Sequence, residues 1–451
     1  MKTASATIAT FAANFRNYAL TPAQRHLAYR ALVDTYAVAI AGRHEDAPRI
    51  ARAYVADIAG QGRASVWASD ESMRAEEAAW LNAITAHVLD YDDVMQPMRG
   101  HISAALVPPL AALAQQIGAS GRDYAQAYIA GFEVLAKFSR VMAIEHYSKG
   151  WHSTSALGVL GGAIAGSVLL GLDESRTAHA LGLAVAQAGG TRQNFGTMAK
   201  SFQAGQCAAA AVRACLLAQA GFTAATESID GNYGYLALYA NREDAGPVLA
   251  ELGIAPLDIE AIGIDIKKYP CCYATGRGID AALALRQAHG LTLDAVESAQ
   301  VTTSARGLEA VIYPRPTNGL EAKFSIEYTT AAALLDGSIG LSSFDDASVM
   351  RPAIRDFLPR ISKSEAAGNA LPRWTELKLT LKSGDIVNKR VVIARGDSGD
   401  PLSDDELIAK VTDCFAYGRH ESAARDFAAR AFAMDGLRFD EVLPALQRSA
   451  A

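Results

Sequence analysis

The chain has 451 residues, is 50% hydrophobic and 20% charged, and carries a net charge of -6. Its length exceeds one ordinary hydrophobic core, so two domains are expected. The acidic balance excludes the basic surface typical of proteins that bind nucleic acid or anionic membranes, so we expect neither partner. Five cysteines suggest no disulfide framework, and residues 1–13 lead into no signal-peptide cleavage site, so a cytoplasmic location is expected.

Helices are predicted to dominate from the N-terminus to about Gly253. Thr21-Pro22-Ala23-Gln24 is a capping box with proline at the first helical position, and it predicts a helix through Ile40 that ends near Gly42. Residues 156–172 are apolar over about a membrane-spanning length but contain five glycines and a serine. We therefore predict a buried helix of small residues there.

A charged loop, residues 90–101, follows a predicted helix over residues 78–89. Pro97 and Gly100 interrupt the helical pattern, and the next apolar helix is expected only around Pro108-Pro109, running to Ile117. Solvated aspartates that cap helices are one interpretation of this loop. The other is a set of catalytic groups presented on a connection, namely Asp90, Asp92, Asp93, Arg99 and His101.

A smaller α+β domain is predicted over residues 263–394. Isoleucines alternate with Gly263 and Asp265 over residues 262–266, which is strand spacing, and residues 377–381 and 391–394 flank a turn in the manner of a hairpin. Ser403-Asp-Asp-Glu406 is a second capping box, so the tail returns to helices. The predicted fold is mainly α, with a discontinuous all-helical domain, residues 1–262 and 395–451, and residues 263–394 as a lid.

Four segments resemble the MmgE/PrpD family in order along nearly the whole chain. They are residues 89–114, Gly-Trp-His-Ser-Thr-Ser-Ala-Leu-Gly at 150–158, Gly-Thr-Met-Ala-Lys-Ser-Phe-Gln-Ala-Gly at 196–205, and Lys-Lys-Tyr-Pro-Cys-Cys at 267–272. The resemblance implies a homodimeric enzyme that acts on a small polycarboxylate without a cofactor. No zinc motif, P-loop or Gly-x-Ser-x-Gly element occurs in the sequence, so no metal site is expected.

Two candidate site residues can also be argued from their surroundings. His152 begins an apolar helix, and a helix N-terminus disfavours imidazolium, so this histidine would stay neutral and accept a proton. Lys200 has apolar flanks, which suits an ammonium that holds a carboxylate or, with a lowered pKa, transfers a proton. The alternatives are a packing histidine and a solvated surface lysine.

The family pattern extends this set. Lys267 and Lys268 would point to opposite faces of a strand, and the pattern selects Lys267 for the site. Cys271 and Cys272 are more typical of packed thiols than of nucleophiles. The resemblance implies that His101, His152 and Tyr328 belong to the site as well. The predicted catalytic set is Asp90, His101, His152, Lys200 and Tyr328, and the predicted substrate-binding set is Arg99, Gln203, Lys267, Lys268 and Cys272.

This inventory suits proton transfer at a carbon beside a carboxylate, which can lead to epimerisation, dehydration or decarboxylation. The chain has Val94, Ile102 and Gln203 where dehydratase and decarboxylase members usually have a hydroxyl residue, proline and histidine. An epimerase would tolerate these losses, so we predict epimerisation of iminodisuccinate or a similar compound. Dehydration of the 2-methylcitrate type is the alternative, and decarboxylation of cis-aconitate is third. A binding or scaffolding member without catalysis is the non-enzymatic alternative, against which the retained charged groups argue.

Overall fold

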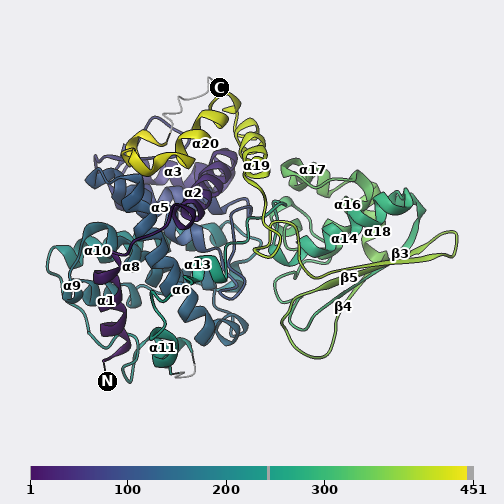
Figure 1. Ribbon diagram of the computed structural model, residues 1–451. Coiled ribbons are helices and arrows are strands. Elements are labelled where there is room, and N and C mark those ends of the chain that lie inside the picture. The colour runs from purple at the N-terminus through teal and green to yellow at the C-terminus, as the bar shows by residue number, and fades with distance from the viewer. Residues whose placement is uncertain (1, 241–243, 444–451) are drawn as a thin grey trace.

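Two hydrophobic cores divide the chain. The side chains of the first core come from the segments 4–266 and 402–443. Those of the second core come from the segment 269–379. The computed structural model describes residues 2–240 and 244–443. Figure 1 shows a large helical domain beside a smaller domain with a sheet, and the yellow tail helices pack on the large domain.

The helical domain is an assembly of α-helices with one short hairpin of β1 (Ala64–Ser65) and β2 (Ser72–Met73). Its helices are α1 (Ala4–Phe15), α2 (Pro22–Gly42), α3 (Asp46–Ala56), α4 (Ala75–His87), α5 (Ile102–Ile117), α6 (Gly121–Ser148), α7 (Ser153–Ala156), α8 (Gly158–Leu170), α9 (Glu174–Val185), α10 (Ala199–Gln219), α11 (Tyr235–Tyr239), α12 (Gly246–Leu249), α13 (Asp258–Ala261), α19 (Asp404–Tyr417) and α20 (Ala424–Phe432).

Both predicted capping boxes are present. The Thr21 hydroxyl accepts from Gln24 N and the Gln24 side chain accepts from Thr21 N, which opens α2 at Pro22. Ser403 and Glu406 make the equivalent pair at the start of α19. Because α19 packs directly on α2, residues from the two ends of the chain share one core.

The predicted buried helix of small residues is also confirmed. Within the described residues, Ser153–Leu170 is the one helical run apolar and long enough to cross a membrane, and 94% of it is buried inside the protein. Glycines let its neighbours approach closely, since a Cβ on Gly158 would lie 2.5 Å from the Ala105 side chain and one on Gly161 2.4 Å from Leu135. The run therefore serves as core.

Two local predictions are wrong. Helix α5 begins at Ile102 rather than near Pro108, and both prolines lie inside it. The Asp93 carboxylate accepts from the backbone N–H of Ser103, which stabilises the earlier start. Residues 262–266 form no strand, only an isolated bridge between Val94 and Asp265. The neighbouring Ser398 donates its backbone N–H to the Asp265 side chain rather than to a backbone carbonyl.

The small domain is a four-stranded sheet covered by helices. Its helices are α14 (Tyr273–His289), α15 (Gly319–Ala322), α16 (Ile326–Asp336), α17 (Asp346–Val349) and α18 (Pro352–Phe357). Its strands, in the order β4-β3-β5-β6, are β4 (Ile361–Glu365), β3 (Val296–Thr303), β5 (Thr375–Leu381) and β6 (Ile386–Val391). The β5–β6 hairpin confirms the predicted one, and Gly384 takes the positive φ of 92° that its turn requires.

The register of the sheet places one of its ends beside the helical domain. Thr303, the last residue of β3, pairs with Thr375, the first residue of β5. The hairpin at the other end of β5 points away from the helical domain (Figure 1). The segments just after β3 and just before β5 therefore reach the boundary between the domains.

Candidate active site

A cavity at this boundary is lined by both domains. The loop of residues 90–101, the starts of α7 and α10, and the segments after β3 and before β5 all contribute to its wall. Six residues named from sequence line it: Asp90, Arg99, His101, His152, Lys200 and Cys272. Lys267 and Gln203 lie directly behind, hydrogen-bonded to Asp90 and His152.

Asp90 is clamped between two lysines. Lys200 Nζ lies 2.6 Å from Asp90 Oδ1, and Lys267 Nζ lies 3.0 Å from Oδ2 and 2.6 Å from the carbonyl oxygen of the same residue. Burial acts to raise the pKa of Asp90, but the two ammonium groups outweigh it and hold the pKa well below its usual range. The backbone of Asp90 is left-handed, with φ 54°, a strained conformation of the kind that clusters at functional sites.

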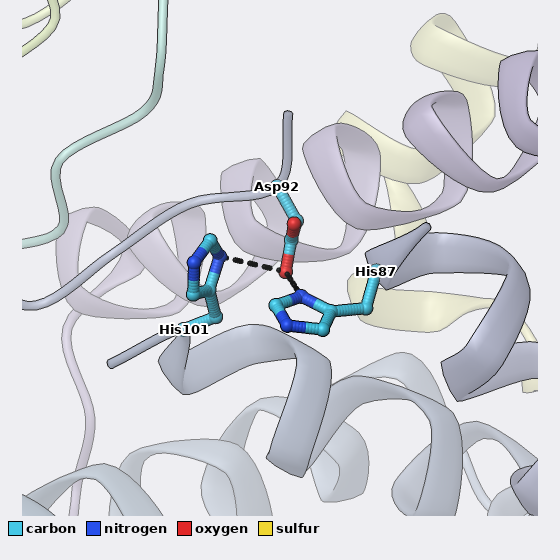
Figure 2. A group of neighbouring side chains, drawn as sticks. All are labelled: His87, Asp92 and His101. Atoms are coloured by element: carbon cyan, nitrogen blue, oxygen red, sulfur yellow. Dashed lines mark hydrogen bonds and ion pairs between the residues drawn. The ribbon is translucent and has the colours of Figure 1, made fainter. Parts of the chain in front are cut away.

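Asp92 lies between two histidines (Figure 2). Its Oδ2 is 2.8 Å from His87 Nδ1 and 3.0 Å from His101 Nδ1, while His101 Nε2 is 3.3 Å from Asp90 Oδ1. On its other side, His87 Nε2 accepts a hydrogen bond from Lys200 Nζ at 2.7 Å. Burial lowers the pKa of His87 to about 4, so this imidazole is neutral at ordinary pH. The two carboxylates, two imidazoles and Lys200 form one network of hydrogen bonds and close ion-pair contacts.

The same cluster has the composition of a metal site. His87, Asp92 and His101 each offer a ligand atom, and these atoms lie within 4.8 Å of one another. The nitrogen atoms that face Asp92 already contact its Oδ2 at hydrogen-bonding distance, and the ammonium of Lys200 lies beside His87. A cation would have to break these contacts and approach a positive charge, so the arrangement fits a proton network better than a metal centre.

His152 lines the cavity and keeps one ring nitrogen without a partner within the described chain. Its Nδ1 donates to Gln203 Oε1 at 2.7 Å, and Gln203 is oriented by its own donation to the carbonyl of Thr191. Nε2 is buried and has no hydrogen-bond partner among the described residues. Burial, reinforced by the charge of Lys200, keeps the pKa of His152 well below its usual range. The neutral ring thus carries an unused lone pair on Nε2.

The two cavity histidines occupy equivalent helix positions. His101 is the N-cap of α5 and His152 the N-cap of α7. The backbone N–H of His101 donates to Thr154 Oγ1 at 3.0 Å, which joins the two helix starts. Gly100 is required at this crossing, since a Cβ there would lie 2.9 Å from Thr154 N.

Three buried lysines hold three successive carbonyl groups of the active-site loop. Lys323 donates to the carbonyl oxygen of Leu89 at 2.7 Å, Lys267 to that of Asp90 at 2.6 Å and Lys410 to that of Tyr91 at 2.9 Å. Lys323 also donates to Pro270 O and Lys410 to Lys267 O. The small domain and the tail helix therefore both fix the loop relative to the segment of residues 267–270.

Three residues named from sequence lie differently from expectation. Tyr328 is buried in the core of the small domain, where its hydroxyl donates to Ser343 O, and it does not line the cavity. Lys268 is exposed beside the Tyr269 ring. Arg99 lines the cavity, but its guanidinium pairs with Glu309 at 2.6 Å.

Cys272 also lines the cavity. Burial raises the pKa of its thiol, which disfavours a thiolate nucleophile.

Some cavity residues were missed from sequence. His87 ends α4 just before the charged loop, and its place in the last turn of a predicted helix beside Asp90 was a usable signal. Arg306 and Arg373 line the cavity from the small domain. Neither lies in a recognisable motif, because their position depends on the pairing of β3 with β5.

Comparisons with known proteins agree with the two-domain architecture. Residues 6–247 match the MmgE/PrpD N-terminal domain and residues 269–432 match the MmgE/PrpD C-terminal domain. The chain is 28% identical to cis-aconitate decarboxylase of Homo sapiens over 394 residues, which cover 84% of this chain and 81% of that protein. It is 31% identical to cis-aconitate decarboxylase of Mus musculus over 350 residues, with coverages of 74% and 70%. Identity to cis-aconitate decarboxylase of Aspergillus terreus is 23% over 399 residues, with coverages of 82% and 80%.

Both domain matches occur in order and together span most of the sequence. The relatives at 28% and 31% identity extend the similarity across the same two domains. The chain belongs to the MmgE/PrpD family.

Proposed function

We propose that the chain is a lyase that releases carbon dioxide from a small unsaturated tricarboxylate of the cis-aconitate type. The observation that carries this proposal is the pair of free hydrogen-bonding groups in the cavity. Lys200 uses two of its three N–H groups on Asp90 and His87 within the described chain, and His152 Nε2 uses none of its capacity there. Lys200 can therefore bind a substrate carboxylate, and His152 can exchange a proton with the reacting carbon.

The chemistry requires one proton and two anchors. When the carboxylate on the saturated carbon leaves as carbon dioxide, its bonding electron pair forms a new carbon–carbon double bond. The pair of the old double bond moves to the carbon beside a retained carboxylate and takes up a proton. A trianion and a proton thus become a dianion and carbon dioxide, so the site has to supply the proton and hold the two retained carboxylates.

The described groups fit these tasks. Lys200 pairs with Asp90 through one N–H group, and another of its N–H groups would hold a retained carboxylate by a charge-assisted hydrogen bond. His152 is neutral in the unliganded protein, but substrate carboxylates raise the pKa of a neighbouring imidazole because they favour imidazolium. His152 would then take up a proton on substrate binding and deliver it from Nε2 to the carbon.

The lyase is favoured over the epimerase expected from sequence. Of the three residue changes that pointed to an epimerase, only Val94 lines the cavity. Ile102 is buried in the core of the helical domain, and Gln203 lies behind His152. Two of the changes therefore remove no group from the cavity. The three relatives described above are all named as decarboxylases, which supports the same choice.

A single incubation separates the candidate reactions. The protein is incubated in deuterated water with cis-aconitate, 2-methylcitrate, citrate and iminodisuccinate, and the products are followed by NMR and by carbon dioxide release. We expect carbon dioxide from cis-aconitate and one deuterium in the dicarboxylate product. Loss of water from 2-methylcitrate would instead identify a dehydratase, and deuterium at Cα of iminodisuccinate without other mass change would identify an epimerase.

We also expect the protein to be a homodimer, and analytical ultracentrifugation tests this expectation.

A further inference from the structure

Arg373 lies on the wall of the cavity without an anionic partner. It belongs to the segment between β4 and β5. Within the described chain its guanidinium makes no hydrogen bond and no ion pair. Burial, together with the positive charges of Arg99 and Arg277, lowers its pKa to about 10. The carboxylate of Glu309 opposes this shift, but it is paired with Arg99, so the guanidinium of Arg373 is left to attract another anion.

Arg99 and Lys200, the other cations discussed for this cavity, already have protein partners. Arg99 donates to Glu309 at 2.6 Å and to the carbonyl oxygen of Arg306 at 3.0 Å, and its guanidinium lies over the Tyr147 ring. Lys200 is bound to Asp90 and His87, which leaves it a single N–H group. Arg373, which is half-buried, is therefore a cation of the cavity wall whose guanidinium has its full hydrogen-bonding capacity available within the described chain.

The backbone around Arg373 is fixed by the sheet. Ser304 N donates to Trp374 O at 3.1 Å, which continues the β3–β5 pairing past its last residue pair and aligns the two chain segments. Arg306 lies on the other segment in a left-handed conformation, with φ 59°. Glu365 accepts from Arg306 N at 3.1 Å and so holds that strained residue.

Arg306 is also free to bind a ligand. Its guanidinium lies 3.8 Å from Glu145, and both side chains are exposed, so this contact is weak. Arg306 and Arg373 come from neighbouring strand ends and line the same cavity as Lys200 and His152. A guanidinium presents a planar fork of N–H donors that matches a carboxylate.

We propose that Arg373, assisted by Arg306, forms an anion subsite for a substrate carboxylate remote from the carbon that is protonated. The subsite selects polycarboxylates, because a ligand with a single carboxylate cannot reach both Lys200 and this pair of arginines. The inference rests on the proposed function only in assuming that a polycarboxylate occupies this cavity.

The test measures binding separately from turnover. Calorimetric titration compares cis-aconitate with its three monocarboxamides, each lacking one negative charge, on the wild-type protein and on R373Q, R373K and R306Q. R360Q is the matched control, since Arg360 is an exposed arginine of the same domain that does not line the cavity. We expect R373Q to weaken cis-aconitate binding by about ten- to a hundredfold, the usual effect of losing a charge-assisted hydrogen bond. R306Q should have a smaller effect, R373K an intermediate one, and R360Q none.

The carboxamides identify the partner of Arg373. One carboxamide lacks the carboxylate that Arg373 binds, so its affinity for the wild-type protein should equal the affinity of cis-aconitate for R373Q. On R373Q, the affinities of this carboxamide and of cis-aconitate should be equal, because the charge that distinguishes them no longer has a partner. The subsite is refuted if R373Q and R360Q bind cis-aconitate like the wild type, or if R373Q weakens all four ligands by one common factor. Thermal unfolding of each variant confirms that it is folded, and R306Q provides the test if R373Q does not fold.

The proposed subsite and the proposed reaction can be refuted independently. If cis-aconitate binds in an Arg373-dependent manner but no carbon dioxide is released, the subsite stands and the proposed lyase reaction falls. If carbon dioxide is released and R373Q retains wild-type affinity, the reaction stands and the subsite falls. If no polycarboxylate binds the wild-type protein, both fall.

Discussion

Lys410 Nζ lies 2.6 Å from Asp34 Oδ1, so the tail helix α19 is joined to α2 by a buried ion pair. The same ammonium donates to the carbonyl oxygens of Tyr91 and Lys267, each at 2.9 Å. Tyr91 follows Asp90 in the chain, and Lys267 is one of the two lysine partners of Asp90. A side chain from the last tenth of the sequence thereby supports the geometry of the cavity without lining it.

Replacing Lys410 with methionine should reduce both stability and turnover. The change leaves Asp34 buried without its counter-ion, and breaking a buried pair from one side costs about 3 to 5 kcal/mol. It also frees the carbonyls of Tyr91 and Lys267, so kcat should fall by about tenfold or more while KM changes little. Denaturant titration and steady-state kinetics measure the two effects.

The double variant D34L/K410M separates them. Replacing both members of a buried pair by apolar residues is often neutral for stability, so the free energy of unfolding should recover in part, short of the cost of the two carbonyls that lose their donor. Turnover should stay low, because the carbonyls still lack their donor. Recovery of full kcat in the double variant would mean that Lys410 acts on stability alone.

His152 is expected to affect turnover far more than binding. H152N should lower kcat by about a hundredfold or more, as loss of a general acid or base usually does, while the affinity for cis-aconitate changes little. Q203L removes the acceptor that orients the His152 ring and should have a smaller effect on kcat, about tenfold. The assignment of His152 to proton transfer fails if H152N keeps more than a tenth of wild-type kcat.

Stability should fall with decreasing pH between 6.5 and 4, in part through His146. Burial lowers the pKa of His146 from 6.5 to about 4. Between these values the unfolded chain binds a proton that the folded chain does not, so the free energy of unfolding decreases as pH falls through this window. The buried His87 contributes in the same direction.

The variant H146Q isolates the contribution of His146. It should reduce the slope of unfolding free energy against pH by at most about 1.4 kcal/mol per pH unit. Urea titrations across the window measure the slope, and equal slopes for the two proteins would contradict the account.

Turnover should withstand exhaustive treatment with a chelator. His87, Asp92 and His101 have the composition of a metal site, but their facing atoms are engaged with one another and Lys200 lies beside them. We expect no bound metal by elemental analysis and no gain of activity on adding zinc, manganese or iron. Loss of activity on chelation with recovery by one divalent ion would assign this cluster to a metal instead.

Local sequence signals were sufficient for much of the fold. The capping boxes at Thr21 and Ser403, the β5–β6 hairpin and the buried glycine-rich helix depend on interactions within a few residues of each other. Prolines misled the prediction of α5, because the contact of Asp93 with Ser103 and the surrounding core stabilise a helix that begins before Pro108. The alternating isoleucines at 262–266 were misleading too, since a strand also needs a ladder of backbone hydrogen bonds and this segment forms only the bridge to Val94.

The sequence by itself determined the family, and it was enough to name Asp90, His101, His152 and Lys200, which line one cavity, as candidate site residues. Only the tertiary structure decided which of the other groups join them. Tyr328 is held in the small core by its bond to Ser343, whereas Arg373 reaches the cavity because β3 and β5 end together. Likewise the freedom of His152 Nε2 and the occupation of Arg99 by Glu309 depend on partners 51 and 210 residues away. Hydrogen bonds and ion pairs of this kind are set by the packing of distant elements, so no local pattern in the sequence records them.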